Sequence, residues 1–461
     1  MNIFDPEDTI AAISTAAGEG GIGIIRLSGP HALAKASLIF RKKSPNKDIE
    51  SHRFYLGEIL DPETNGIIDE CLLVYMKAPR SFTREDVVEL HCHGGTIVLQ
   101  SVLELIMRAG VREAGPGEFT KRAFMNGRID LSQAESVIDI IRAKTERGLR
   151  LAEAELKGGL KEALAPVKES LVNTLATLEA FIDFPEEDID PHILSRINNN
   201  INEAIINLGK LLDSYEDGRI LREGIHVVIA GKPNVGKSSL LNALLKERRA
   251  IVTSMPGTTR DIIEEIINIK GIPVKLIDTA GIRDTDDIAE KEGINRTREK
   301  LDEADLVLYM VDNSGLSGDD LIYFNNGRVE KTILLINKSD LLLKGKVPDF
   351  ISNLPGVPFL TLSCTTGIGI EELKEKIYKT VLHHGPDASP TVVVSRKRHK
   401  VALASAQKLL NRALTGIDEN NPLEITSIDI KGALDHISEL TGETTPDDVL
   451  EKIFGEFCIG K

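Results

Sequence analysis

The segment 231–238 has residue types and spacing suited to phosphate chemistry. It reads GKPNVGKS, which matches G-x-x-x-x-G-K-[ST], and it lies between the apolar run IHVVIA and the helix-prone run SLLNALL. In such a loop, backbone N–H groups and the following helix N-terminus bind phosphate oxygens, the lysine reaches the terminal phosphates and the hydroxyl binds Mg²⁺. The residues expected at a nucleoside triphosphate are Asn234, Val235, Gly236, Lys237, Ser238 and Ser239, with Ser238 also a Mg²⁺ ligand.

The segment NKSD at 337–340 predicts which base is bound. The Asp340 carboxylate can accept hydrogen bonds from guanine N1–H and the exocyclic amine, whereas adenine would leave that carboxylate unpaired. We expect Asn337 on the O6/N7 side of guanine and the stem of Lys338 over the base. The segment Ser363, Cys364 and Thr365 lies where GTPases carry a weaker guanine-contacting loop, although an ordinary strand end explains it almost as well.

Two further segments have the order and composition of the parts that sense the γ-phosphate, DTAG at 278–281 and PGTTRD at 256–261. Thr259 is expected to close onto Mg²⁺ and the γ-phosphate, Asp278 to hold the Mg²⁺ shell through water, and the Gly281 N–H to contact the γ-phosphate. The remaining residues expected near the nucleotide are Thr253, Ser254, Met255, Pro256, Gly257, Thr258, Thr279 and Ala280.

Ile282 stands where Ras-like GTPases usually carry the glutamine that orients the attacking water. This hydrophobic residue, together with Asn234 and the GTTRD segment, resembles the translation-factor-class GTPases that bind K⁺. The resulting expectation is an oxygen cage for K⁺, which would neutralise developing charge. Its ligands would be the Asn234 amide oxygen and the backbone carbonyls of Thr253, Met255 and Thr258.

The water itself needs another group to orient it. Glu290 is our candidate, acting through a second water, and it lies in the acidic, helix-prone segment 286–300. By pattern alone, a solvated helix face explains a single glutamate in such a run better. The family resemblance given below favours the catalytic role.

The elements that must position these residues fall into three groups, as expected for a chain of 461 residues. Residues 1–120 mix short β-like runs with turns and predict an α+β domain. Residues 216–380 alternate apolar strands with helices, which predicts a doubly wound α/β domain with a mostly parallel sheet. Residues 121–215 and 381–461 have helical periodicity, and we expect one helical domain with the α/β module inserted into it. Two separate helical domains are the alternative.

Within this division, residues 215–224 have the composition of a linker.

Composition narrows the function classes. The net charge of −15 excludes a generally basic nucleic-acid-binding surface, and a solvated helix start is the favoured interpretation of the basic run at 395–400. We expect no signal peptide or membrane-spanning helix, because no apolar run is long enough. Four scattered cysteines fit a reducing cytosol, so a cytoplasmic location is expected. His91, Cys92 and His93 suggest a metal site, but no other Cys/His cluster would complete it.

Three segments resemble the MnmE (TrmE) family of tRNA-modification GTPases. They are AGPGEFTKRAFMNGRIDLSQAE at 114–135, FIDFPEEDID at 181–190 and FCIGK at 457–461. Together with the GTPase motifs, the resemblance covers nearly the whole chain. It implies a homodimer joined through N-terminal domains that are similar to the folate-binding domains of glycine-cleavage aminomethyltransferases. It also implies a helical domain that receives the GTPase domain as an insertion, with K⁺ promoting dimerisation of the GTPase domains and hydrolysis driving an open–closed cycle.

The same resemblance implies a reaction. With the FAD protein MnmG (GidA), in a heterotetramer or larger complex, the family forms a carboxymethylaminomethyl or aminomethyl group at carbon 5 of wobble uridine in tRNA. A tetrahydrofolate such as 5-formyltetrahydrofolate supplies the one-carbon unit, and glycine or ammonium supplies the amine.

Carried over by position, the folate contacts fall on Arg26, Glu89, Arg128 and Lys461. A carboxylate suits the pterin N–H groups, and the cations suit the glutamate tail. The family often has lysine at position 128, so Arg128 is a mild departure. Cys458 is the family's tail cysteine, and roles in the modification chemistry and in structure are both open.

Two other functions compete with this one. A K⁺-dependent ribosome-assembly GTPase would share the P-loop and GTTRD features, but neither the folate-like domain nor the tail. A folate-dependent transferase with a vestigial GTPase module conflicts with the intact phosphate and guanine motifs.

Overall fold

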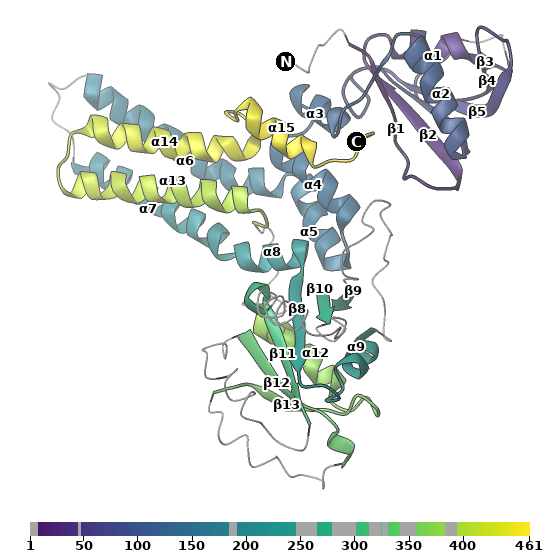
Figure 1. Cartoon of the computed structure of the whole chain (residues 1–461). Helices are drawn as coiled ribbons and strands as arrows, with labels where there is room; N and C mark the ends of the chain where they lie inside the picture. Colours follow the sequence, from purple (N-terminus) through teal and green to yellow (C-terminus); the bar gives the residue numbers. More distant parts are fainter. Residues whose placement is uncertain are drawn as a thin grey trace, which may run out of the picture. The chain divides into compact units, whose positions relative to one another are not determined.

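The computed structural model describes residues 8–44, 48–183, 191–245, 265–278, 301–312, 324, 331–341, 356–382 and 394–461. The chain forms two compact units, Met1–Ile138 with Ser438–Lys461, and Asp139–Ile437. The predicted multidomain α/β class is confirmed: one unit combines a mostly antiparallel sheet with helices, and the other combines several helices with a mostly parallel sheet (Figure 1). Among the described residues, no helix combines the length and apolar character needed to cross a membrane.

The first unit combines a sheet with helices. Its described strands are β1 (Ile10–Ile13), β2 (Gly20–Ser28), β3 (Phe40–Lys42), β4 (Phe54–Leu60), β5 (Ile67–Met76), β6 (Val87–Gly94) and β7 (Arg112–Glu113). Its described helices are α1 (Ala32–Ile39), α2 (Thr96–Arg108), α3 (Glu118–Met125), most of α4 (Leu131–Arg142) and α15 (Asp447–Gly455).

These strands form one sheet with its larger apolar core on one face, and a smaller cluster covers β1 on the other. The described strands follow the order β3-β4-β5-β6-β2-β1-β7 and are antiparallel except for the β1–β7 pair. Side chains of β2 and β6 alternate, so that Ile25, Leu27 and Leu90 pack in a core that includes Leu105 of α2. The residues between them face the other side, and β2 and β6 place the polar residues Arg26 and Glu89 there.

The C-terminal residues complete this unit. Leu450 and Phe454 of α15 pack in one cluster with Leu131 and Ile138 of α4. We expected residues 121–215 and 381–461 to form the helical domain, whereas α3, most of α4 and α15 group with the N-terminal sheet. Helical periodicity indicates a helix but does not say what its apolar face packs against. The boundaries of the functional domains stay a prediction.

The second unit contains a set of long helices. They are α5 (Glu146–Leu156), α6 (Gly159–Asp183), α7 (Pro191–Asp213), α8 (Tyr215–Glu223), α13 (Lys397–Asp418) and α14 (Leu423–Thr441, whose last residues belong to the first unit). Polar contacts join neighbouring helices: Gln407 Nε2 of α13 donates to the Ile205 carbonyl of α7 at 3.1 Å. Arg412 Nε of α13 donates to Asp429 Oδ2 of α14 at 2.7 Å.

The second unit also contains the nucleotide-binding module. Its described elements are β8 (Ile225–Gly231), α9 (Lys237–Leu245), β9 (Glu265–Ile269), β10 (Ile272–Asp278), β11 (Leu306–Val311), β12 (Thr332–Ile336), the 3₁₀ turn η3 (Ser339–Leu341), β13 (Phe359–Thr361) and α12 (Ile370–Val381). The described strands follow the order β13-β12-β11-β8-β10-β9, and only β9–β10 is antiparallel. Continuous apolar runs such as β11 and β12 are buried on both faces, as a doubly wound sheet requires.

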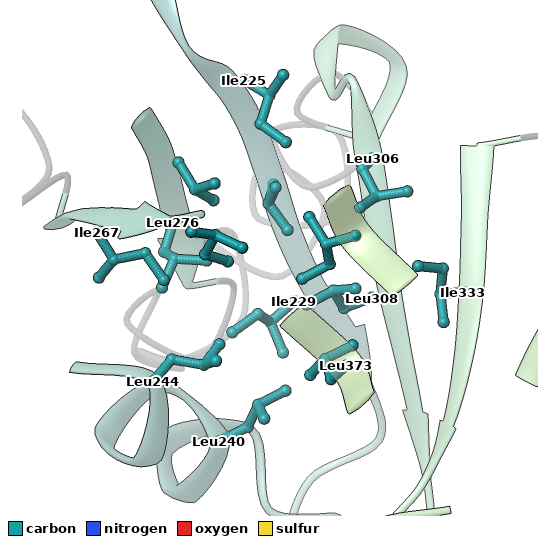
Figure 2. Close-up of a cluster of buried hydrophobic side chains, with 14 of the residues drawn as sticks. Ile225, Ile229, Leu240, Leu244, Ile267, Leu276, Leu306, Leu308, Ile333 and Leu373 are labelled. Atoms are coloured by element: carbon teal, nitrogen blue, oxygen red, sulfur yellow. The ribbon is translucent and has the colours of Figure 1, made fainter. Parts of the chain in front are cut away.

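The core of this module fixes the strand from which the phosphate loop leaves. Figure 2 shows Ile229 of β8 near Leu240 and Leu244 of α9 and Leu373 of α12, while Ile225 of the same cluster lies toward the other end of the strand. Burial of these side chains anchors β8 and α9 on either side of residues 232–236, so the loop between them has fixed ends.

The linker predicted at 215–224 is wrong, because residues 215–223 form helix α8. Tyr215 and Ile220 are buried, and the Glu216 carboxylate accepts a hydrogen bond from Lys400 of α13 at 3.2 Å. This helix is rich in charged residues and is stabilised by partners on other elements. Apolar periodicity in the sequence therefore does not predict it.

Candidate functional site

Two glycines shape the predicted phosphate loop. Gly231 has φ 137°, and a Cβ there would lie 2.3 Å from the Met310 carbonyl oxygen. Gly236 has φ 106°, and a Cβ there would lie 2.2 Å from Asn337 Nδ2. Both the backbone conformation and the close approach of neighbours require glycine at these positions.

The phosphate-binding groups lie at the start of α9. Asn234, Ser238 and Ser239 are exposed, and Val235 is buried. Lys237 Nζ donates to the carbonyls of Gly231 and Lys232 at 2.8 Å each. Because the first turn of α9 carries no acidic residue, its N-terminus favours an anion.

Asn337 joins the phosphate loop to the predicted guanine loop. Its Nδ2 donates to the Val235 carbonyl at 2.8 Å, and its Oδ1 accepts from the Cys364 N–H at 3.2 Å. The residue is only 4% exposed. We expected it on the O6/N7 side of guanine, whereas the structure shows an amide that braces two loops; a contact with guanine stays a prediction.

The other residues predicted for guanine lie next to this brace. Lys338 has φ 61°, its Nζ is 3.0 Å from Asp312 Oδ2, and Asp340 is exposed in η3. Ser363 is buried, and its carbonyl accepts from the Gly367 N–H at 2.9 Å, which forms a turn.

Cys364 is half-buried and Thr365 is exposed. Burial raises the pKa of the Cys364 thiol to about 11. The structure therefore brings the NKSD and SCT segments together at the ends of β12 and β13.

Most of the predicted switch and K⁺ residues lie outside the described residues. Asp278 ends β10 opposite Ile229 of β8, so its backbone lies beside the strand that leads into the phosphate loop. The residues outside the described part are Thr253, Ser254, Met255, Pro256, Gly257, Thr258, Thr259, Thr279, Ala280, Gly281, Ile282 and Glu290. The K⁺ cage, the Thr259–Mg²⁺ contact and the role of Glu290 stay predictions.

A second group of predicted residues converges in the first unit. Arg26 of β2 and Glu89 of β6 are directly opposite in the antiparallel register. Arg26 Nε donates to Glu89 Oε1 at 2.9 Å, and Nη2 lies 2.8 Å from the same oxygen. The other oxygen, Oε2, is 3.2 Å from His91 Nε2. The sequence analysis missed this contact, although residues 89 and 91 share a face of one strand.

Two phenylalanines surround the ion pair. The Arg26 guanidinium lies 5.8 Å from the Phe82 ring centroid and 5.7 Å from that of Phe119. Arg128 lies 4.9 Å from the same Phe82 ring, and its Nη1 donates to the Phe82 carbonyl at 2.7 Å. These distances are in the range of cation–π contacts. Phe82 and Phe119 had no distinguishing sequence signal and were not predicted.

The C-terminal tail brings Lys461 to this group. The Phe119 N–H donates to the Lys461 carbonyl oxygen at 3.2 Å. Gly460 has φ 93°, and a Cβ there would lie 2.3 Å from the Ile13 carbonyl oxygen. Burial and the nearby Arg26 charge lower the pKa of Lys461, while Glu89 and Cys458 act in the opposite direction. Cys458 is exposed. Of the four predicted folate residues, Arg26 and Arg128 lie against the Phe82 ring, and Glu89 and Lys461 lie close to Arg26.

A buried ion network fixes the helix that carries Phe119. Arg122 is fully buried, and its guanidinium contacts Glu118 at 3.1 Å and Glu85 at 3.2 Å. Burial acts to raise the pKa of Glu118, but the hydrogen bond from Arg112, the Gly115 N–H and nearby guanidinium charges outweigh it and lower that pKa. Because breaking a buried pair is costly, this network fixes α3 and with it Phe119.

The two histidines of the HCH segment each contact a carboxylate. His93 Nδ1 is 2.6 Å from Asp69 Oδ1, and His91 is the partner of Glu89 described above. Within the described ranges, no group of three His, Cys, Asp or Glu residues is arranged to hold a metal ion.

Comparisons with known proteins give the family. The family model described as the MnmE helical domain matches residues 131–458, and the model described as the GTP-binding protein TrmE N-terminus matches residues 9–128. The tRNA modification GTPase MnmE of Geobacter sulfurreducens is 52% identical over 457 residues, which cover 99% of both chains. The chain belongs to the MnmE family of tRNA modification GTPases. The MnmE protein of Carboxydothermus hydrogenoformans is 48% identical over 460 residues, 99% of this chain and 100% of that one. The predicted activity class, a GTP hydrolase involved in tRNA modification, is thereby confirmed.

Solved structures also match part of this MnmE-family chain. Era of Aquifex aeolicus bound to GDP·AlF₄⁻ is 28% identical, covers 40% of this chain and 66% of its own, and has a TM-score of 0.29. The G domain of the T. maritima FeoB iron transporter is 32% identical, covers 34% of this chain and 99% of its own, and has a TM-score of 0.26.

Proposed function

We propose that this chain is a K⁺-dependent GTPase that acts with an FAD-containing MnmG/GidA-type partner on tRNA. The product is a carboxymethylaminomethyl or aminomethyl group at carbon 5 of wobble uridine, with the one-carbon unit taken from 5-formyltetrahydrofolate or a related tetrahydrofolate. The observation that carries this proposal is that Arg26, Glu89, Arg128 and Lys461 come together beside Phe82. The same chain also has the phosphate loop and the predicted guanine loop.

The GTP site would work mainly by positioning and charge. The N–H groups at the start of α9 bind the phosphates, Lys237 leaves the loop carbonyls for the terminal phosphates, and Ser238 binds Mg²⁺. Asp340 selects guanine from an exposed position beside the Asn337 brace. Asn234 and the carbonyls of the following switch would hold K⁺, and Glu290 would orient the water that attacks the γ-phosphate.

The folate site would combine a hydrogen-bond acceptor, cations and an aromatic surface. Arg26 occupies Glu89 Oε1, so a pterin N–H would use the acceptor capacity that remains on Oε2 beside its His91 contact. Phe82 offers a flat face to a ring, and Arg128 and Lys461 suit the carboxylates of a glutamate tail. Cys458 would lie at the edge of this site, where its thiol is accessible.

The partners follow from the same proposal. A homodimer joined through the N-terminal domains, the MnmG/GidA-type protein and tRNA are the expected partners, in the cytoplasm. Because the chain has a net charge of −15, tRNA would be held by a local basic surface or largely by the partner.

Nucleoside analysis of tRNA tests this proposal directly. In a strain that lacks the protein, the wobble-uridine modification should be absent, and the wild-type gene should restore it. Glu89→Gln should not restore it, because the amide cannot replace the carboxylate toward Arg26 and the pterin. Normal modification in the strain without the protein would reject the proposal and favour ribosome-assembly defects as the next measurement.

The GTPase chemistry has its own test. Turnover should rise at least tenfold when K⁺ replaces Na⁺, and Glu290→Ala should retain GTP binding but slow hydrolysis at least a hundredfold, a loss of about 2.7 kcal/mol of transition-state stabilisation. Equal hydrolysis rates in K⁺ and Na⁺ would contradict the proposed K⁺ site. An unchanged rate in Glu290→Ala would show that Glu290 has no catalytic role and favour a solvated helix face.

A further inference from the structure

Helix α8 is the segment through which the chain passes into the GTPase module. It ends at Glu223, two residues before β8 begins, and β8 runs to Gly231 of the phosphate loop. The chain returns to the helices at Val394. Both connections therefore lie in the second unit, where their contacts can be compared.

One side of α8 is fixed to the GTPase sheet. Arg219 Nη2 is 3.2 Å from Asp305 Oδ1, and Asp305 Oδ2 accepts from the His226 N–H of β8 at 2.9 Å. At the end of α8, Gly224 has φ 83°, and a Cβ there would lie 2.3 Å from the Pro273 carbonyl oxygen. The helix and the sheet are thus in close backbone contact at this point.

The other side of α8 is fixed to the helices, and one carboxylate serves both connections. Asp139 Oδ2 lies 2.6 Å from Arg396 Nη2, directly after the returning connection, and Asp139 Oδ1 lies 3.8 Å from Arg222 Nη1 in the last turn of α8. The exposed fractions of these side chains are 12% for Asp139 and Arg396 and 19% for Arg222. Ser214 Oγ, just before α8, accepts from the Val394 N–H at 3.0 Å.

We propose that Asp139 is a positioning residue that ties both connections of the GTPase module to α4 and so couples GTP turnover to tRNA modification. Asp139 lies outside the phosphate and guanine loops, and in this proposal it acts through Arg222 and Arg396. The inference rests on the proposed function, because coupling has meaning only if GTP turnover serves the modification.

The local packing allows this joint to change. Asp139, Arg222 and Ser395 line a cavity of about one water's size. Ser395 Oγ and Arg222 Nε are buried there without a hydrogen-bond partner among the described residues. A water bound in this cavity, or a rearranged side chain, would satisfy these atoms, so the joint has room for a second hydrogen-bond arrangement. A second pairing of similar free energy is what a two-state element needs.

The test uses the full-length chain with Asp139→Asn. Asparagine keeps the shape but removes the charge that pairs with Arg396 and lies 3.8 Å from Arg222, whose guanidinium also contacts Glu223. Asp139→Glu restores the charge, and Glu153→Gln on the exposed face of α5 is a matched control for loss of one carboxylate. Each variant is assayed for kcat and KM of GTP hydrolysis in K⁺ and for tRNA modification with the FAD partner. Hydrogen exchange of α8 and residues 394–400 is measured with GDP and with a non-hydrolysable GTP analogue.

For Asp139→Asn we expect kcat and KM of GTP hydrolysis within twofold of wild type, and tRNA modification at least tenfold slower. The exchange difference between the two nucleotides should disappear in α8 and at 394–400 but persist in the phosphate loop. The glutamate variant should recover at least half of the modification rate, and Glu153→Gln should match wild type.

Modification at the wild-type rate in Asp139→Asn would overturn the proposal, as would a parallel fall of hydrolysis and modification. If that variant fails to fold, Arg222→Gln and Arg396→Gln take its place. If both arginines act through Asp139, the double variant should modify tRNA only slightly more slowly than the slower single variant. Fully additive losses of modification rate would overturn the proposal. If wild type itself modifies no tRNA, the proposed function fails, and the exchange comparison alone decides on Asp139.

Discussion

At the scale of single residues, the guanine-specificity motif divides its work between two side chains. The Asn337 amide is buried and bonded to Val235 and to the loop of Cys364. Asp340 is exposed and free to meet a ligand from solution. We therefore expect base selection to depend mainly on the carboxylate, while Asn337 holds the phosphate loop and the predicted guanine loop together.

This division predicts the effect of Asp340→Asn. The amide can no longer accept both the N1–H and the amine of guanine, but it can donate to the extra carbonyl oxygen of xanthine. We expect GTP affinity to fall by about 10²-fold or more, with a gain for xanthosine triphosphate. Competition against a fluorescent guanine nucleotide measures both, and Leu341→Ala, at an exposed neighbour, is the control. Unchanged preference for GTP would contradict the assignment.

Cys364 and Cys458 should differ in thiol reactivity because one is half-buried and the other exposed. A pKa of about 11 leaves Cys364 about one part in a thousand thiolate at pH 8, so it should react slowly with a disulfide reagent. Its reactivity should rise as pH increases from 8 toward 11, since deprotonation is delayed by burial. Cys458 is exposed and should react first. Mass spectrometry of the labelled peptides would show the order, and faster labelling of Cys364 than of Cys458 would be incompatible with it.

At the scale of elements, the C-terminal tail is an integral part of the first unit. Ile459 forms a bridge with Pro116, and Gly460 fits under the Ile13 carbonyl only because it has no side chain. The tail positions Lys461 beside Arg26 and Glu89. Its docking therefore depends on backbone geometry more than on the charge of any one residue.

Gly460→Ala tests that dependence. The added methyl would lie 2.3 Å from a backbone oxygen at a left-handed φ, so the tail should undock. We expect affinity for 5-formyltetrahydrofolate to fall about tenfold or more, and Cys458 to label faster. Gly455→Ala is the matched control, because a Cβ there meets no atom within 4 Å. Calorimetric titration measures the affinity, and equal values for both variants would show that the tail does not support binding.

Sequence reasoning located the elements whose signal is local. The phosphate loop requires glycines at fixed spacing, and the strands around it are continuous apolar runs, so both were predictable. The α8 helix was missed because partners on other elements hold it. The Arg26–Glu89 pairing and the aromatic ring of Phe82 beside it depend on strand register and on a distant loop, which no local pattern specifies.

At the scale of the whole molecule, the GTPase module is an insertion whose two ends are held together. The Val394 N–H and Ser214 Oγ bond across the gap, and Asp139 contacts residues on both sides of it. Ends that lie close together are typical of modules that can be inserted or removed without disturbing the host.

Replacing residues 225–393 by a short Gly/Ser linker should therefore leave the remaining chain folded. We expect loss of all nucleotide binding, but binding of 5-formyltetrahydrofolate within about threefold of wild type, because Arg26, Glu89 and Lys461 lie in the other unit. Circular dichroism checks the fold and titration checks the ligand. Loss of folate binding in a folded variant would show that the two activities share more structure than these contacts indicate.

The first unit is assembled from residues 1–138 and 438–461. During synthesis on the ribosome its sheet emerges early, but the apolar surface of Leu131 and Ile138 must wait for Leu450 and Phe454. At about 5–20 residues per second, residues 139–437 take roughly 15–60 s to make. Throughout that interval the nascent chain displays an uncovered hydrophobic surface, which makes it a natural client for chaperones that bind growing polypeptides.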